Sequence, residues 1–422
     1  MTSSAPEKGG LIGRLSVMMF LQYAIWGAWL PLFFAYLTVD RGFKPEQAGM
    51  LFGVSAVGAL IAPFIFGQIA DRILPTERLL AVLHIVGAGL MWKLGSLSEY
   101  SHLVVFGLIY SMCYSPTMAL TNSLAFHHLP DRDRQFPKVR LWGTIGWIVV
   151  GIGMGQWLLS RYVDDALPEK LRIAKQVSGY ADSFKLASIL GLAMGLYSLT
   201  LPHTPPSRSE QSLAFAKAAK FILRHPLVTL FLVSFPVACI HHFYVVRTVD
   251  FLDNLKIRTP AIDKIFGIGG GPMTIGQIAE ILVLASIPAL AKIASRKTLL
   301  LIGLAAYVAR FAVFAYAPSA AAVFPALALH GLCFGCVFFV SFMIIDEETP
   351  ADVRATAQSL FNLVIVGIGI IVGNISAGWI GKAATLADGT TDYRRLFAIP
   401  MWVAVGCFML LLLLYPSRKK EA

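Results

Sequence analysis

Glu280 is a carboxylate well inside a long apolar run of this sequence. In TIGQIAEILVL, Gln277 precedes it by three residues, so both side chains share one face of a helix. A carboxyl group in an apolar site can hold a proton near neutral pH and release it again. Gln277 can donate and accept hydrogen bonds, which suits a polar, uncharged substrate. The pair predicts a site for proton and substrate, with a permanent ion pair between Glu280 and a cation such as Arg310 as the alternative.

A second polar stripe lies in VRLWGTIGW. Arg140, Thr144 and Trp147 are spaced i, i+4 and i+7, and therefore follow one side of a helix. A guanidinium, a hydroxyl and an aromatic face could together hydrogen-bond a substrate and stack on its ring. The alternative is that Arg140 anchors the chain at the membrane surface while Trp147 packs.

Two histidines and two cysteines lie in apolar runs. In CIHHFYVV, His241 and Tyr244 share a helix face and His242 points elsewhere. His241 could handle a proton or bind substrate, or it could hydrogen-bond between helices. A zinc site would need further ligands at suitable spacing, which are lacking near the histidines and near the CxxC of Cys333 and Cys336. We expect no metal and no other cofactor.

The composition places these residues in a membrane. Of 422 residues, 57% are hydrophobic and 14% charged, whereas soluble domains carry about 25% charged residues. A bilayer-spanning helix needs about 20 mainly apolar residues. Apolar runs between breaks predict an all-α membrane protein with twelve transmembrane helices. The expected spans are approximately 15–37, 46–70, 79–97, 103–126, 137–160, 184–201, 226–246, 272–294, 298–316, 321–345, 356–380 and 396–415.

The twelve spans divide into six and six. Residues 1–202 and 226–422 are expected to form two six-helix bundles, joined by a cytoplasmic linker at 203–225 with a short amphipathic helix at 211–224. This plan is typical of transporters that hold substrate near the midplane between two similar halves. The loop sequence GQIADRILPTER, between the second and third spans, resembles the loop at this position in the major facilitator superfamily.

Charge distribution sets the expected orientation. An even number of spans puts both termini on one side, and the loops on that side hold more Lys and Arg, which favours cytoplasmic termini. The net charge of +11 therefore indicates basic loops rather than a nucleic-acid partner. No P-loop, HExxH or GxSxG motif occurs, which argues against an enzyme, and a substrate sensor would need an output domain.

Several stretches together resemble the nucleoside:proton symporter family of the major facilitator superfamily, the bacterial nucleoside permeases. They include FLQYAIWGAWL, SPTMALTNSLAF, FPKVRLWGTIGW, IGQIAEIL, ARFAVFAYA and VRATAQSLF. The resemblance implies proton-coupled uptake of nucleosides by alternating access, in a monomer of the bacterial inner membrane. Its partners would be the nucleoside, the proton and the lipid bilayer.

The resemblance also implies roles for particular residues. Arg140, Thr144, Trp147, Gln277 and Glu280 match positions that contact nucleoside or support coupling, and Glu280 would carry the proton.

The chain departs from the family pattern in spans 7 and 10. His241 and Tyr244 stand where the family has Gln and Asn, and Phe334 is followed by Gly335 where family permeases can carry an Asp. We expect His241, Tyr244 and Phe334 to contact substrate. The departures leave a sugar or another polar metabolite, with or without proton coupling, as the alternative cargo.

Overall fold

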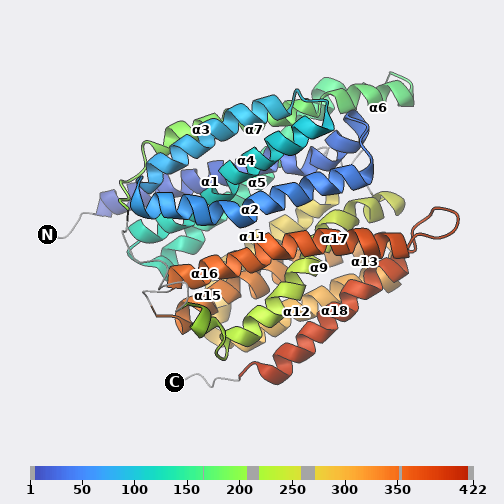
Figure 1. Ribbon diagram of the computed structural model, residues 1–422. Helices are drawn as coiled ribbons and strands as arrows, with labels where there is room; N and C mark the ends of the chain where they lie inside the picture. The colour runs from blue at the N-terminus through green and yellow to red at the C-terminus, as the bar shows by residue number, and fades with distance from the viewer. Residues whose placement is uncertain (1–4, 165, 207–217, 258–270, 351–353, 417–422) are drawn as a thin grey trace. The chain divides into compact units, whose positions relative to one another are not determined.

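The structure is a computed structural model that describes residues 5–164, 166–206, 218–257, 271–350 and 354–416. Its regular elements are helices, apart from one isolated bridge between Thr385 and Thr391. By internal contacts the chain divides into two units: unit 1 contains α1 to α7, and unit 2 contains α9 to α18. Figure 1 colours the helices from blue to red along the chain.

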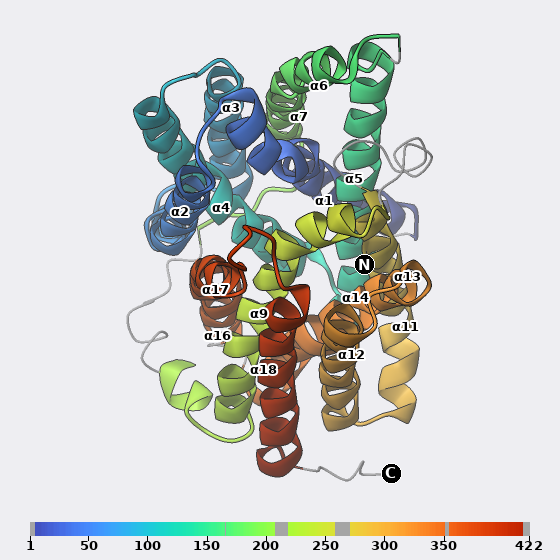
Figure 2. The same ribbon diagram turned by 90° about the vertical axis from the view of Figure 1, so that its right-hand side faces the viewer.

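Among the described residues, unit 1 is built from six long helices and one short one. They are α1 (Ala5–Ala35, continued by a π-helical turn at Tyr36–Asp40), α2 (Pro45–Arg72), α3 (Thr76–Leu94), α4 (Tyr100–His128), α5 (Arg132–Tyr162), α6 (Glu169–Ser178) and α7 (Ala181–Ser198). The short, polar helix α6 starts after Pro168 and connects α5 to α7, as Figure 2 shows. It was not predicted, because it is too short and too polar to span a membrane.

Unit 2 contains more interruptions. Its helices are α9 (Leu227–Asn254), α11 (Thr274–Ile293, after a 3-10 turn at Gly271–Met273), α12 (Arg296–Tyr316), α13 (Ala320–Ala328), α14 (His330–Cys333), α15 (Val340–Glu348), α16 (Arg354–Asn362), α17 (Gly369–Ala383) and α18 (Tyr393–Leu414). A π-helical segment at Phe334–Phe339 joins α14 to α15, and another at Leu363–Ile368 joins α16 to α17. The predicted spans 321–345 and 356–380 are therefore each composed of several helical pieces.

Helices occupy all twelve predicted spans, which confirms the all-α membrane fold class. Within the described residues, nine helices are long and apolar enough to cross a membrane. The other three predicted spans coincide with α2, α3 and α7, of which α3 carries Glu77, Arg78 and Lys93 and α7 begins with Asp182 and Lys185. Large apolar side chains such as Trp379, Trp402 and Leu413 are mostly exposed, as expected of surfaces that face lipid.

The same order of helix pairing occurs inside each unit. In unit 1 the first long helix packs on the fifth (α1 on α5), the second on the fourth (α2 on α4) and the third on the sixth (α3 on α7). In unit 2 the corresponding pairs are α9 with α17, α11 with α14, and α12 with α18. The pairs α3–α7 and α12–α18 lie side by side in both ribbon views (Figures 1 and 2). The described helices of the two units are thus paired on the same internal plan.

The chain after α7 is attached to unit 1. Thr204 donates its backbone N–H to Oε2 of Glu77 at 3.0 Å, and the Glu77 Oε1 lies 2.8 Å from Nδ1 of His203. His128 contacts the hydroxyl of Thr204 at 2.8 Å. Of the amphipathic helix expected at 211–224, residues 218–222 are helical, whereas 211–217 lie outside the described residues.

Candidate functional site

Three glycines bring α11 and the α14 region into close contact in unit 2. A Cβ at Gly276 would lie 2.8 Å from Cβ of His330, and one at Gly331 would lie 2.7 Å from the backbone nitrogen of Glu280. A Cβ at Gly335 would lie 2.7 Å from Cγ1 of Val283. Such small residues let helix backbones approach closely in membrane proteins. The approach places Glu280 of α11 beside His330 of α14.

Glu280, His330 and Arg310 form a buried row. Nε2 of His330 lies 3.7 Å from Oε2 of Glu280, and Nδ1 of the same ring lies 3.2 Å from Nη1 of Arg310. Glu280 is 8% exposed, His330 9% and Arg310 0%. The imidazole therefore lies between the carboxylate and the guanidinium.

Aromatic faces surround the buried Arg310. Its guanidinium carbon lies 3.9 Å from the ring centroid of Tyr244 and 4.9 Å from that of Tyr307. Within the described residues, Nε and Nη2 of Arg310 have no hydrogen-bond partner. Cation–π attraction contributes about 2 kcal/mol when desolvated, so the two rings help to keep this charge inside the unit.

The other predicted residues of unit 2 lie around this row. His241 is half-buried, and its Nδ1 lies 2.7 Å from the hydroxyl of Tyr307. Its ring centroid lies 5.1 Å from that of His330 and 6.2 Å from that of Phe334. Gln277 is half-buried and one turn before Glu280 on α11. Tyr244 is 1% exposed and stacks on His330, so its ring supports the buried charges.

The predicted stripe of unit 1 lies on α5. The guanidinium carbon of Arg140 is 4.0 Å from the ring centroid of Tyr23, and its Nη1 has no hydrogen-bond partner among the described residues. Thr144 is 8% exposed. Trp147 is half-buried and meets Trp26 edge-on at 5.9 Å. A guanidinium group and an aromatic ring thus lie along one helix, α5.

Glycines also set the approach of α1 to α5. A Cβ at Gly27 would lie 2.5 Å from the carbonyl oxygen of Trp147, and one at Gly146 would collide with the carbonyl oxygen of Phe20. A Cβ at Gly143 would lie 2.8 Å from Nη1 of Arg140. The WGTIGW glycines therefore make room for both the neighbouring helix and the Arg140 side chain.

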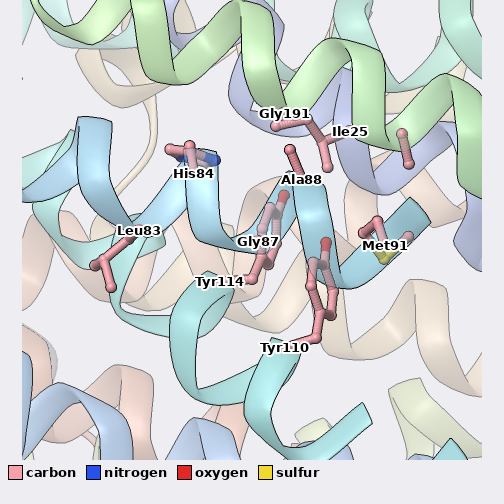
Figure 3. A pocket seen from close by; sticks show the side chains of 10 residues that line it. Ile25, Leu83, His84, Gly87, Ala88, Met91, Tyr110, Tyr114 and Gly191 are labelled. Carbon is pink, nitrogen blue, oxygen red and sulfur yellow. The ribbon is translucent and has the colours of Figure 1, made fainter. Parts of the chain in front are cut away.

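A polar network at the centre of unit 1 was not predicted. Gln22 is fully buried, donates to the Thr117 hydroxyl at 2.8 Å and lies 2.9 Å from Nε2 of His84. His84 lines a small pocket together with Tyr110 and Tyr114, which extend from α4 toward α3 in Figure 3. The Tyr114 hydroxyl donates to the carbonyl oxygen of Gln22 at 2.5 Å. These hydrogen bonds connect α1, α3 and α4.

The cysteines and histidines do not form a metal-ligand cluster in the part of the chain that the structure describes. Cys333 and Cys336 are buried free thiols. Cys333 ends α14 and Cys336 lies within the π-helical segment, and both pack in the core of unit 2.

Comparison with known proteins matches almost the whole chain. The family model described as nucleoside H+ symporter matches residues 10–420. The putative nucleoside transporter YegT of Escherichia coli is 30% identical over 375 residues, which are 85% of this chain and 82% of that protein. The xanthosine permease of Escherichia coli is 28% identical over 411 residues, which are 92% of this chain and 91% of that protein.

A solved structure shows the same fold. The crystal structure of the nucleoside transporter NupG has a TM-score of 0.75 and 23% sequence identity, and the match covers 97% of this chain and 100% of that chain. The shared fold is that of the major facilitator superfamily.

Proposed function

Because the chain belongs to the nucleoside H+ symporter family, we propose that it carries a nucleoside together with a proton across the membrane by alternating access. It is a multi-pass membrane transporter and not an enzyme. The observation that carries the proposal is the buried carboxyl group of Glu280, one turn from Gln277 and next to His330.

Glu280 is the proposed proton carrier. When protonated it is neutral, so the unit can bury it at low cost, whereas the ionised form in an apolar site needs donors nearby. Glu280 would take up the proton on the acidic side of the membrane and release it on the other side. The proton gradient would thereby drive the movement of nucleoside.

The other residues have proposed roles in binding. Gln277, Arg140, Thr144 and His241 would hydrogen-bond the polar groups of the nucleoside. Trp147 and Phe334 would contact its base ring, because aromatic faces stack on planar rings. Tyr244 would act through Arg310, whose charge its ring face stabilises.

The first test is transport by the purified protein in liposomes. With an inward proton gradient, the wild type should concentrate labelled nucleosides from a panel of purines and pyrimidines. Glu280→Gln should still exchange nucleoside across the membrane but should not concentrate it, because the amide cannot carry the proton. Equal accumulation by wild type and variant would show that Glu280 does not couple transport.

A sugar or another polar metabolite is the alternative cargo. Two departures from the family pattern favour this alternative: His241 and Tyr244 stand where the family has Gln and Asn. His241 contacts Tyr307, and Tyr244 contacts Arg310. Thermal unfolding of the detergent-solubilised protein with nucleosides and sugars separates the two, since a ligand of the folded state raises the unfolding temperature.

We further propose that the protein is a monomer with both termini in the cytoplasm of a bacterial inner membrane. The excess of Lys and Arg in the loops on the terminal side supports this orientation. Labelling of single cysteines, introduced at the two ends, from outside intact cells tests it: neither end should react.

A further inference from the structure

His330 connects the carboxylate of Glu280 to the buried cation of unit 2. The guanidinium of Arg310 can only donate hydrogen bonds, so Nδ1 of His330 must accept the bond of 3.2 Å. The proton of the neutral imidazole is therefore on Nε2, which faces Oε2 of Glu280 at 3.7 Å. The ring thus presents a donor toward the carboxylate.

Packing from three helices fixes this ring. Glu280 faces it from α11 and Arg310 from α12, while Tyr244 and His241 of α9 lie against it with centroids at 5.3 and 5.1 Å. A flip of the imidazole would break the bond to Arg310, so the donor stays directed at α11. A displacement of less than about 1 Å would bring Nε2 into hydrogen-bond range of Glu280.

We propose that His330 is a positioning residue that promotes release of the proton from Glu280. It holds Nε2–H toward the carboxylate, and through Nδ1 it couples the carboxylate to the positive charge of Arg310. In the release step the O–H bond of Glu280 breaks and the proton passes to water, while His330 keeps its own proton. This role rests on the proposed function of Glu280 as the proton carrier.

The test is the pH dependence of nucleoside uptake into liposomes, with labelled adenosine and uridine as probes. A donor to a carboxylate favours its ionised form. His330→Leu removes both ring nitrogens, so Glu280 should release its proton only at higher pH. We expect the pH of half-maximal uptake to rise by about one unit, a tenfold change in proton affinity.

Three further variants separate positioning from packing. His330→Gln offers an amide acceptor and donor in place of the ring nitrogens, so its pH shift should be at most half of that seen with His330→Leu. His242→Leu, which removes the neighbouring histidine on α9, should keep the wild-type profile. His330→Phe keeps the ring stack on Tyr244 but has no ring nitrogens. If His330→Leu does not exchange nucleoside in the absence of a gradient, His330→Phe is used as the test variant instead.

The outcomes distinguish this inference from the proposed function. Suppose that the wild type concentrates nucleoside with the gradient. If His330→Leu or His330→Phe then exchanges nucleoside and keeps the wild-type pH profile, His330 does not position the carboxylate. A shift that His330→Gln does not reduce would also overturn it. If the wild type does not respond to the gradient, proton coupling itself is wrong and the role of His330 falls with it.

Discussion

Glu77 is a buried carboxylate whose partners are the first residues after α7. It is 5% exposed, and it accepts the backbone N–H of Thr204 while contacting His203. The backbone N–H of Thr76 in turn donates to the carbonyl oxygen of Thr204 at 3.0 Å. One side chain therefore fixes where the chain leaves unit 1.

The contact predicts the effect of Glu77→Ala. The substitution leaves the buried N–H of Thr204 without its acceptor, which costs about 1–3 kcal/mol, so thermal unfolding in detergent should occur at a lower temperature than in the wild type. Glu99→Ala is the matched control: its carboxylate is 68% exposed and pairs with His102, and such surface pairs contribute about 1 kcal/mol or less. Equal unfolding temperatures for the two variants would contradict the anchoring role.

Single residues were predictable from sequence only where helical spacing determines a face. The stripe of Arg140, Thr144 and Trp147 and the pair of Gln277 and Glu280 follow from spacing along one helix. The contacts of His330 could not be predicted, because they join residues 20 and 50 positions apart through helix packing.

Some signals for the missed residues were nevertheless present. His330, Arg310 and Gln22 are polar residues inside apolar runs, which in a membrane must be paired or functional. His84, inside the apolar run LLAVLHIV, carried the same signal, whereas Tyr307 did not stand out in its helix.

At the level of elements, the position of Glu280 depends on how closely α14 packs on α11. Gly331→Ala would direct a methyl group at the carbonyl oxygen of Ala279 and the nitrogen of Glu280. Both are backbone atoms that cannot move aside, so the helices must separate. We expect loss of gradient-driven uptake together with a lower unfolding temperature.

A glycine without close neighbours provides the control for this prediction. A Cβ at Gly107 of α4 would meet nothing within 4 Å, and Gly107→Ala should retain uptake. If Gly331→Ala transports as well as Gly107→Ala does, close approach of α11 and α14 is not needed for coupling.

The interruptions of the helices in unit 2 could not be predicted from hydropathy. Phe334–Phe339 and Leu363–Ile368 are as apolar as their surroundings, yet both are π-helical. Such segments change the direction of side chains and often occur at functional sites. Hydropathy identifies a span, but it carries no information about a local change in winding.

For the molecule as a whole, the sequence predicted six plus six spans, and the structure adds the pairing inside each half. In both units the first long helix packs on the fifth, the second on the fourth and the third on the sixth. The candidate proton site uses the second, third and fourth helices of unit 2, whereas Gln22, His84 and Thr117 occupy the interior of unit 1. The two halves share a plan and differ in the polar groups that they bury.

Gly335 has a consequence for the energetics of transport. It stands in place of the aspartate that the family resemblance leads one to expect, and a side chain there would collide with Val283. With Glu280 as the proton carrier, one proton would move with each nucleoside. At zero membrane potential, each unit of pH difference could then support at most a tenfold concentration ratio of nucleoside. Each 100 mV of membrane potential would multiply that ratio by about 50. The steady-state ratio in liposomes should rise by one decade per pH unit, whereas a slope of two decades would require a second proton.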